Sequence, residues 1–94
     1  MNFLGIDVGT SGSRAVVINE TGSVLASATA DHAPFASPEI GWAEQDPEDW
    51  WRASSSAIRS VLRKVSADEI ASVSFSGQMH GAVLLNDADQ VLRP

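Results

Sequence analysis

The sequence of 94 residues contains no cysteine. This absence excludes a disulfide-stapled fold and a zinc site ligated by cysteine, and it fits a reducing compartment. Basic residues are also scarce, because 6 Lys and Arg stand against 12 Asp and Glu and give a formal net charge of -6. A field of this sign repels the phosphate backbone of nucleic acids and the head groups of anionic lipids. We therefore expect neither a nucleic-acid partner nor a membrane partner.

Long apolar runs are missing as well. Residues 1–6 are mostly apolar, but no basic residue precedes them and Asp7 ends the run. No stretch approaches the roughly 20 apolar residues that a membrane-spanning helix needs. With 44% hydrophobic and 19% charged residues, the chain has the composition of an ordinary globular segment. We expect a cytoplasmic protein, with one domain at most in this length.

The first 30 residues predict a three-stranded antiparallel meander. Apolar runs at residues 3–8, 15–18 and 24–30 are separated by two clusters of Gly, Ser, Thr and Asn, which favour turns. Residues 31–46 lose this pattern and contain two prolines, one glycine and a single large anchor, Trp42. Loops of such length are usually functional.

A helix is predicted to begin at Pro47. Asp46 is suited to cap the free amides, proline is favoured at the first helical position, and two acidic residues follow in the first turn. Apolar residues then recur with helical spacing at Trp50, Ala57, Ile58, Val61 and Val65. This spacing makes both Trp50 and the adjacent Trp51 better suited to packing at the core and its rim than to stacking on a ligand.

The last third of the chain predicts further strands. Residues 66–69 have the spacing of a capping box and indicate one short turn. Val73 and Phe75 alternate with serines, and two apolar runs at 82–85 and 91–92 flank a turn at 86–89. A helix that links the meander to another strand lets that strand lie parallel to the first. We therefore expect an α/β fold around a mixed sheet.

Asp7 and the residues that follow it form the most informative motif. A carboxylate at the end of an apolar strand needs water, a donor or a cation, and the ends of such strands are where α/β proteins bind ligands. Gly9, Thr10, Ser11 and Gly12 come next, and their backbone can present N–H donors to phosphate oxygens. An aspartate beside phosphate calls for a hard cation between them, so the combination indicates Mg-nucleotide phosphate. The alternative is an ordinary hairpin turn that the aspartate caps.

A second motif, Gly77-Gln78-Met79-His80-Gly81, follows the strand predicted around Val73. If that strand neighbours the first, Gln78 and His80 reach the same crevice as Asp7 and offer neutral donors and acceptors to a hydroxyl-rich ligand. His32, in the long loop, is interpreted as a satisfied or solvated histidine. Two histidines so far apart, without cysteine, argue against a metal site of their own.

Three ordered stretches together resemble one family. Residues 5–12 (GIDVGTSG) are similar to the first phosphate motif of the FGGY carbohydrate kinases, in the actin-like ATPase superfamily. Residues 42–51 (WAEQDPEDWW) and 76–82 (SGQMHGA) resemble the xylulokinase branch of that family. The resemblance covers essentially the whole chain. It implies a ribonuclease H-like fold, of which residues 1–94 form the amino-terminal part of the first lobe, with the second lobe absent.

The resemblance implies that ATP and Mg²⁺ are cofactors and that D-xylulose is phosphorylated to D-xylulose 5-phosphate. In this reading Asp7 helps to place Mg²⁺, and Gly9, Thr10 and Ser11 border the nucleotide phosphates. Arg14 stands where related glycerol kinases have a phosphate-contacting arginine and xylulokinases commonly have lysine. That departure leaves the identity of the sugar open.

For the sugar, the resemblance assigns Met79 and His80 as contacts, with Gln78 a weaker transfer from the family. The family's general base, an aspartate, is expected beyond Pro94, so no catalytic residue is assigned within the chain and the isolated chain is expected to be inactive. A homodimeric full-length enzyme is compatible with the resemblance. The alternatives are another FGGY kinase, acting on ribulose, gluconate or glycerol, and a non-catalytic sugar- or nucleotide-binding module.

Overall fold

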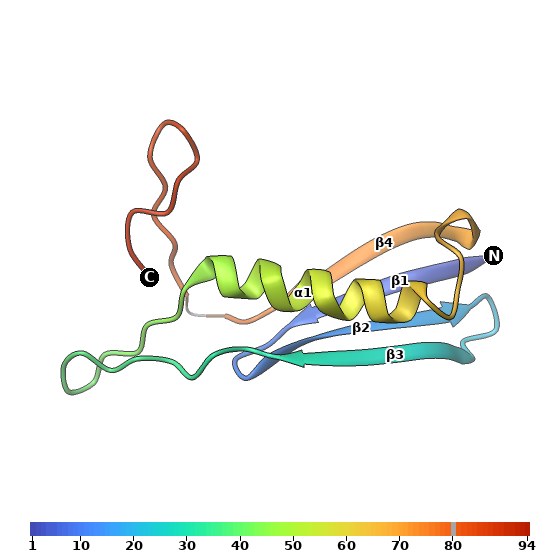
Figure 1. Ribbon diagram of the computed structural model, residues 1–94, viewed down its shortest axis with the longest axis horizontal. Helices are drawn as coiled ribbons and strands as arrows, with labels where there is room; N and C mark the ends of the chain where they lie inside the picture. Colours follow the sequence, from blue (N-terminus) through green and yellow to red (C-terminus); the bar gives the residue numbers. More distant parts are fainter. Residues whose placement is uncertain (80) are drawn as a thin grey trace.

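The computed structural model describes residues 1–79 and 81–94. Its regular elements are four strands, one α-helix and one short 3₁₀ helix (Figure 1). They are β1 (Asn2–Val8), β2 (Gly12–Asn19), β3 (Val24–Asp31), α1 (Pro47–Leu62), η1 (Ala67–Glu69) and β4 (Ile70–Gly77). The expected meander, helix and following strand are therefore all present.

The four strands form one mixed sheet in the order β3-β2-β1-β4. β1 pairs antiparallel with β2, β2 pairs antiparallel with β3, and β4 returns parallel to β1. A parallel return requires a crossover, which α1 supplies by running back along one face of the sheet (Figure 1). The α/β class and the mixed sheet predicted from the sequence are confirmed.

The helix begins as predicted. Asp46 is the N-cap, and one of its carboxylate oxygens accepts a hydrogen bond from the backbone N–H of Glu48 at 3.0 Å. Pro47 occupies the first turn, where its missing N–H costs nothing. The helix ends at Leu62. Val65, the last apolar position of the predicted helical face, therefore lies just after the helix, and its side chain is still buried in the core.

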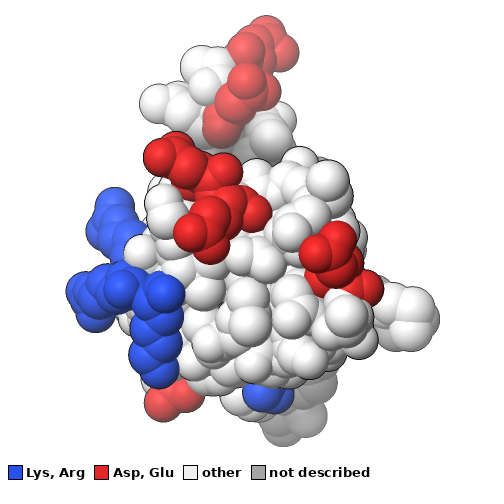
Figure 2. Space-filling view, turned by 90° about the vertical axis from the view of Figure 1, so that its right-hand side faces the viewer, with Lys and Arg blue, Asp and Glu red and all other residues white. Residues whose placement is uncertain are grey.

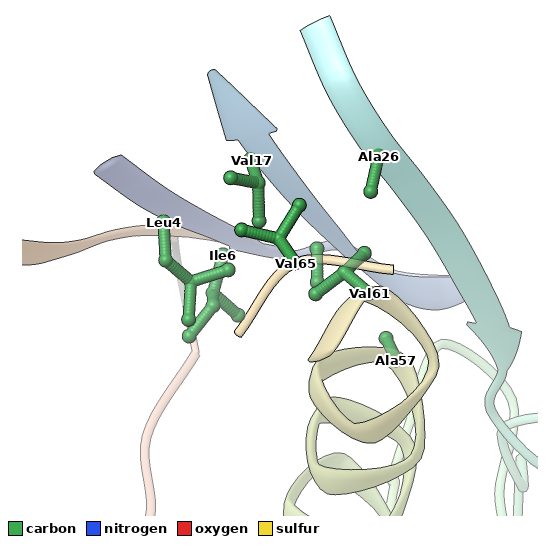
Figure 3. Close-up of a cluster of buried hydrophobic side chains, with 8 residues drawn as sticks. Leu4, Ile6, Val17, Ala26, Ala57, Val61 and Val65 are labelled. Atoms are coloured by element: carbon green, nitrogen blue, oxygen red, sulfur yellow. The ribbon is translucent and has the colours of Figure 1, made fainter. Parts of the chain in front are cut away.

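The core lies between α1 and the sheet. Figure 3 shows small aliphatic side chains of β1, β2 and β3 meeting those of the helix. The cluster consists of Leu4, Ile6, Ala15, Val17, Ala26, Ala57, Val61 and Val65. Because the helix packs over β2 and β3, it leaves the same face of β4 bare. Val73 and Phe75 of β4 are 49% and 71% exposed.

Two segments differ from the sequence-based expectation. Residues 82–85 form no strand; a single isolated bridge joins Leu85 to Val91 across the turn predicted at 86–89. Trp42 does not anchor the long loop in the core, because it is 46% exposed and stacks against the guanidinium of Arg93 at 5.8 Å. The long loop is attached instead by hydrogen bonds, which join Gln45 to the Thr10 carbonyl and the Ala33 N–H to Asp49. Within the described residues, α1 is neither long nor apolar enough to cross a membrane.

Candidate functional site

The two motifs singled out in the sequence meet at one edge of the sheet. β1 and β4 are parallel, and their last residues pair as Asp7 with Ser76 and Val8 with Gly77. The 9–12 turn (Gly9, Thr10, Ser11 and Gly12) leaves β1 there, at the same end as the start of α1 (Figure 1). Strand pairing thus brings residues about 70 positions apart in the sequence to one edge, where α/β folds bind ligands.

Asp7 is exposed on the sheet face opposite α1. Its Oδ1 accepts a hydrogen bond from the Ser76 hydroxyl at 2.8 Å, and Arg14 is its cross-strand neighbour in β2. Asp7, Arg14 and Ser76 line a hollow of about 220 Å³. A single exposed carboxylate with a free oxygen fits Mg²⁺, which keeps most of its water ligands. The site therefore holds one anionic and one cationic side chain on the same face.

The basic residues at the end of α1 lie elsewhere. Arg59 stands in the last turn of the helix, and Arg63 and Lys64 follow its end. Figure 2 views this end of the molecule, opposite the 9–12 turn, and shows Lys and Arg side chains gathered on one side of it. Arg14, by contrast, shares a hollow with Asp7.

Three of the four carbonyl groups of the 9–12 turn accept hydrogen bonds from the protein. The Gly12 carbonyl accepts from the Gly9 N–H at 2.9 Å, the Ser11 carbonyl from the His32 N–H at 2.8 Å, and the Thr10 carbonyl from Gln45 Nε2 at 2.7 Å. The structure gives no acceptor within the described residues to the backbone N–H of Thr10 or Ser11, and both residues are exposed. Two unpaired N–H donors on an exposed turn suit the oxygens of an anion such as phosphate.

A second hollow, of about 840 Å³, opens on the helix side of the same edge. It lies between the 9–12 turn, the long loop, the start of α1 and the end of β4. Among its lining residues are Gly9, Thr10, Gln45, Trp50, Phe75 and Gln78. Trp50 is half-buried here, in agreement with packing at the core or its rim. Trp51 is 71% exposed, so the packing expected for it is wrong.

The predicted site residues are thus distributed over two hollows. Gln78 lines the larger one and Asp7 the smaller one. Strand alternation would place Gln78 on the face of Ser76 and Asp7, but β4 ends at Gly77, so Gln78 is no longer held in the pleat of the sheet. The two hollows adjoin at Phe75 and Ser76, which line both, so the single crevice expected for Asp7 and Gln78 is corrected to two adjoining ones. Met79 is 75% exposed and lines neither hollow. His80, the other predicted sugar contact, lies outside the described residues.

Two residues of the site escaped the sequence analysis. His32 is buried and satisfied, which agrees with its interpretation, but its ring contacts the Thr10 carbonyl of the 9–12 turn. Gln45 bonds the same carbonyl, and the only sequence signal for it was its place within the motif at 42–51. No local pattern indicates either contact, because both depend on the return of the long loop to the sheet.

Asp49 fixes the start of α1 to the long loop. The Arg52 Nε donates to its Oδ1 at 2.7 Å, and the backbone N–H of Ala33 donates to its Oδ2 at 2.7 Å. These donors, with the charge of Arg52, hold the pKa of the Asp49 carboxyl below its usual range. Arg52 also donates to the Asp31 carbonyl at 2.7 Å and so ties the helix to the end of β3.

Comparison with known proteins gives a consistent picture. The model of the amino-terminal domain of the FGGY family of carbohydrate kinases matches residues 2–94. The chain is 44% identical over 92 residues to a xylulose kinase of Klebsiella pneumoniae, with 98% of this chain and 19% of that protein covered. It is 32% identical over 92 residues to a gluconokinase of Bacillus subtilis, with 98% of this chain and 18% of that protein covered.

A solved structure of a kinase from Brucella ovis, described as a xyloylose kinase, superposes on the whole chain. The TM-score is 0.93 at 38% sequence identity, and the match covers 20% of that structure. The chain therefore spans about a fifth of the length of the relatives that it matches. The sequence match and the shared fold agree, and the chain belongs to the FGGY family of carbohydrate kinases.

Proposed function

We propose that this chain is the amino-terminal part of the first lobe of an ATP-dependent sugar kinase that phosphorylates D-xylulose to D-xylulose 5-phosphate in the cytoplasm. The observation that carries the proposal is the position of the 9–12 turn. Its Thr10 and Ser11 N–H groups have no acceptor within the described residues, and the turn directly follows the end of β1, where Asp7 is located. The xylulose kinases among the relatives support the choice of sugar.

In the proposed kinase the turn binds the nucleotide phosphates. The Thr10 and Ser11 amides donate to phosphate oxygens, Gly9 leaves the backbone open to close approach, and the Arg14 guanidinium adds a positive charge. Asp7 would hold the Mg²⁺ that accompanies ATP through water, and this ion supplies charge neutralisation for phosphoryl transfer. These residues position the phosphates, which is most of what this reaction asks of a protein.

The sugar is proposed to bind in the larger hollow, next to the turn. The Gln78 side chain offers both a donor and an acceptor to sugar hydroxyls, and Met79 and His80 follow it in the motif. The aspartate that deprotonates the attacking hydroxyl lies beyond Pro94 in this proposal. In this proposal the 94 residues bind and orient the nucleotide phosphates and the sugar, and the general base is supplied by another part of the kinase.

Replacement of Asp7 tests the proposal. In the kinase that carries this sequence, Asp7→Ala is expected to lower turnover at least about 100-fold, because a positioned charge at the phosphates is lost. The fold should be retained, since Asp7 is exposed and gives up only its bond with Ser76. Asp87→Ala, in an exposed turn, is the matched control and should leave turnover unchanged. Full activity of the Asp7 variant would reject the assignment.

Gluconate is the second candidate substrate, because the gluconokinase of Bacillus subtilis also matches nearly the whole chain. An ADP-release assay with xylulose, ribulose, gluconate and glycerol at equal concentrations separates the candidates. We expect the highest kcat/KM with D-xylulose. A preference for another substrate would keep the kinase and change its sugar.

A further inference from the structure

A chain of three hydrogen bonds runs from α1 to the 9–12 turn through buried side chains. The Ser54 hydroxyl of α1 donates to Ser13 Oγ of β2 at 3.1 Å, and Ser13 Oγ lies 2.8 Å from His32 Nε2. On the other side of the imidazole ring, Nδ1 lies 3.3 Å from the Thr10 carbonyl oxygen. Ser54, Ser13 and His32 are 7%, 0% and 8% exposed, so water cannot readily replace these partners.

The direction of these bonds follows from their end points. A carbonyl oxygen only accepts, so the proton between His32 and Thr10 must sit on Nδ1. In a neutral imidazole Nε2 is then an acceptor, and Ser13 donates to it while accepting from Ser54. An imidazolium would leave the Ser13 proton without a partner. The geometry thus selects the neutral ring with its proton on Nδ1.

A second chain reaches the same carbonyl. Trp50 Nε1 donates to Gln45 Oε1 at 3.1 Å, and Gln45 Nε2 donates to the Thr10 carbonyl at 2.7 Å. Trp50 and Ser54 are four residues apart and therefore lie on the same side of the helix. Two chains that begin one turn apart on α1 thus converge on one oxygen atom.

The Thr10 carbonyl matters because of the group behind it. The peptide unit is planar and trans, so the Thr10 C=O and the Ser11 N–H point in opposite directions. Donors that hold the carbonyl inward therefore direct the Ser11 N–H outward, where no acceptor is found within the described residues. Loss of these donors frees the peptide plane to rotate.

We propose that α1 sets the orientation of the Ser11 amide through the Thr10 carbonyl, with His32 and Gln45 as positioning residues of the phosphate site. This inference rests on the proposed function, since it gives the oriented amide an anion to bind. His32 and Gln45 themselves do not touch the ligand.

Two substitutions of His32 separate its two contacts. In His32→Asn the side-chain amide stands near the place of Nδ1 and retains a donor for Thr10. In His32→Gln the amide stands near the place of Nε2 and retains only the contact with Ser13. Gln45→Leu removes the second donor without touching the buried chain. All three proteins are compared with the unsubstituted one, each labelled with ¹⁵N at serine and histidine.

MgATP is the probe, and the Ser11 amide resonance is the readout. We expect the dissociation constant for MgATP to rise about three- to tenfold in His32→Gln and in Gln45→Leu, as for the loss of one neutral hydrogen bond. In His32→Asn the rise should stay below about twofold. If His32 had only a structural role, both His32 variants would have a lower melting temperature, and their affinities for MgATP would be the same. Equal affinities of the two would overturn the inference.

The histidine tautomer gives a test that needs no variant. A long-range ¹H–¹⁵N spectrum of the unsubstituted protein should show the His32 proton on Nδ1, and a proton on Nε2 alone would overturn the inference. If the Ser11 amide of the unsubstituted protein does not respond to MgATP, the proposed nucleotide site fails instead. Two measurements then still test the positioning role. The first is the tautomer of His32, and the second is the Ser11 resonance, which should shift in His32→Gln but not in His32→Asn.

Discussion

Gly12 stands where the 9–12 turn enters β2, against the backbone of β3. A Cβ atom at this position would lie 2.8 Å from the Ala30 carbonyl oxygen, which no real Cβ tolerates. Backbone is the obstacle, so relief requires one strand to move away from the other. The glycine is thus needed for close approach, and it determines how the turn leaves the sheet.

Gly12→Ala is therefore expected to destabilise the protein by about 1–3 kcal/mol, as overpacking does in a tight site. Urea unfolding followed by circular dichroism measures the loss. Gly77→Ala is the matched control at the end of β4, because a Cβ there would meet nothing within 4 Å. If both variants lose the same stability, close approach to β3 is not the reason for Gly12.

Asp49 illustrates a residue whose charge state belongs to the fold. Because the Arg52 and Ala33 donors hold its pKa below the ordinary value of 3.8, the ionised form is favoured by folding. Its contribution is complete above that ordinary value and is lost as the pH falls through the lower, folded pKa. A carboxyl ¹³C titration should place the midpoint of Asp49 below 3.8. Arg52→Gln should raise it, whereas Arg59→Gln, farther along α1, should not.

At the scale of elements, the start of α1 connects the helix to the long loop that borders the candidate site. Asp46 caps the helix, and Asp49 ties its first turn to the long loop. Asp46→Ala should cost about 1 kcal/mol of stability, within the range of 0.5 to 2 for lost N-caps. Asp46→Asn retains an oxygen for the Glu48 N–H and should cost less. Equal losses in urea unfolding would mean that charge, and not the cap, is what Asp46 supplies.

The elements that the sequence predicts well are those with signals inside a short window. The cap at Asp46 and the alternation around Val73 are such signals, and both elements are present. The run at 82–85 is as apolar as a strand, yet it pairs only at Leu85. A strand needs a neighbour to satisfy its backbone, and within the described residues this run has one bridge partner, Val91.

The candidate site divides in the same way. Asp7 and the 9–12 turn were identified because consecutive residues carry their chemistry. His32 and Gln45 were not, because their contacts with Thr10 appear only when a loop far along the chain folds back. The separation of Asp7 from Gln78 into two hollows was not predictable either, because Gln78 lies just beyond the end of β4, where strand alternation no longer determines the direction of a side chain.

At the scale of the whole molecule, the chain is less compact than its length allows. The radius of gyration is 15.3 Å, whereas about 12 Å is typical for this number of residues. The sheet also ends at β4, whose outer edge has no strand partner within the described residues. On the helix side of that strand, Val73 and Phe75 are left uncovered.

A strand with a free edge and an uncovered apolar face is a template for pairing with another chain. We therefore expect the isolated 94-residue chain to self-associate through β4, so that sedimentation velocity detects dimers or larger species that increase with concentration. Phe75→Lys should shift the distribution toward monomer, because a charge on that face cannot be buried between two copies. Ile40→Lys is the control: Ile40 is also exposed, but it lies in the long loop and not on the sheet. A monomer at every concentration, or equal effects of the two lysines, would show that β4 is not the surface through which copies associate.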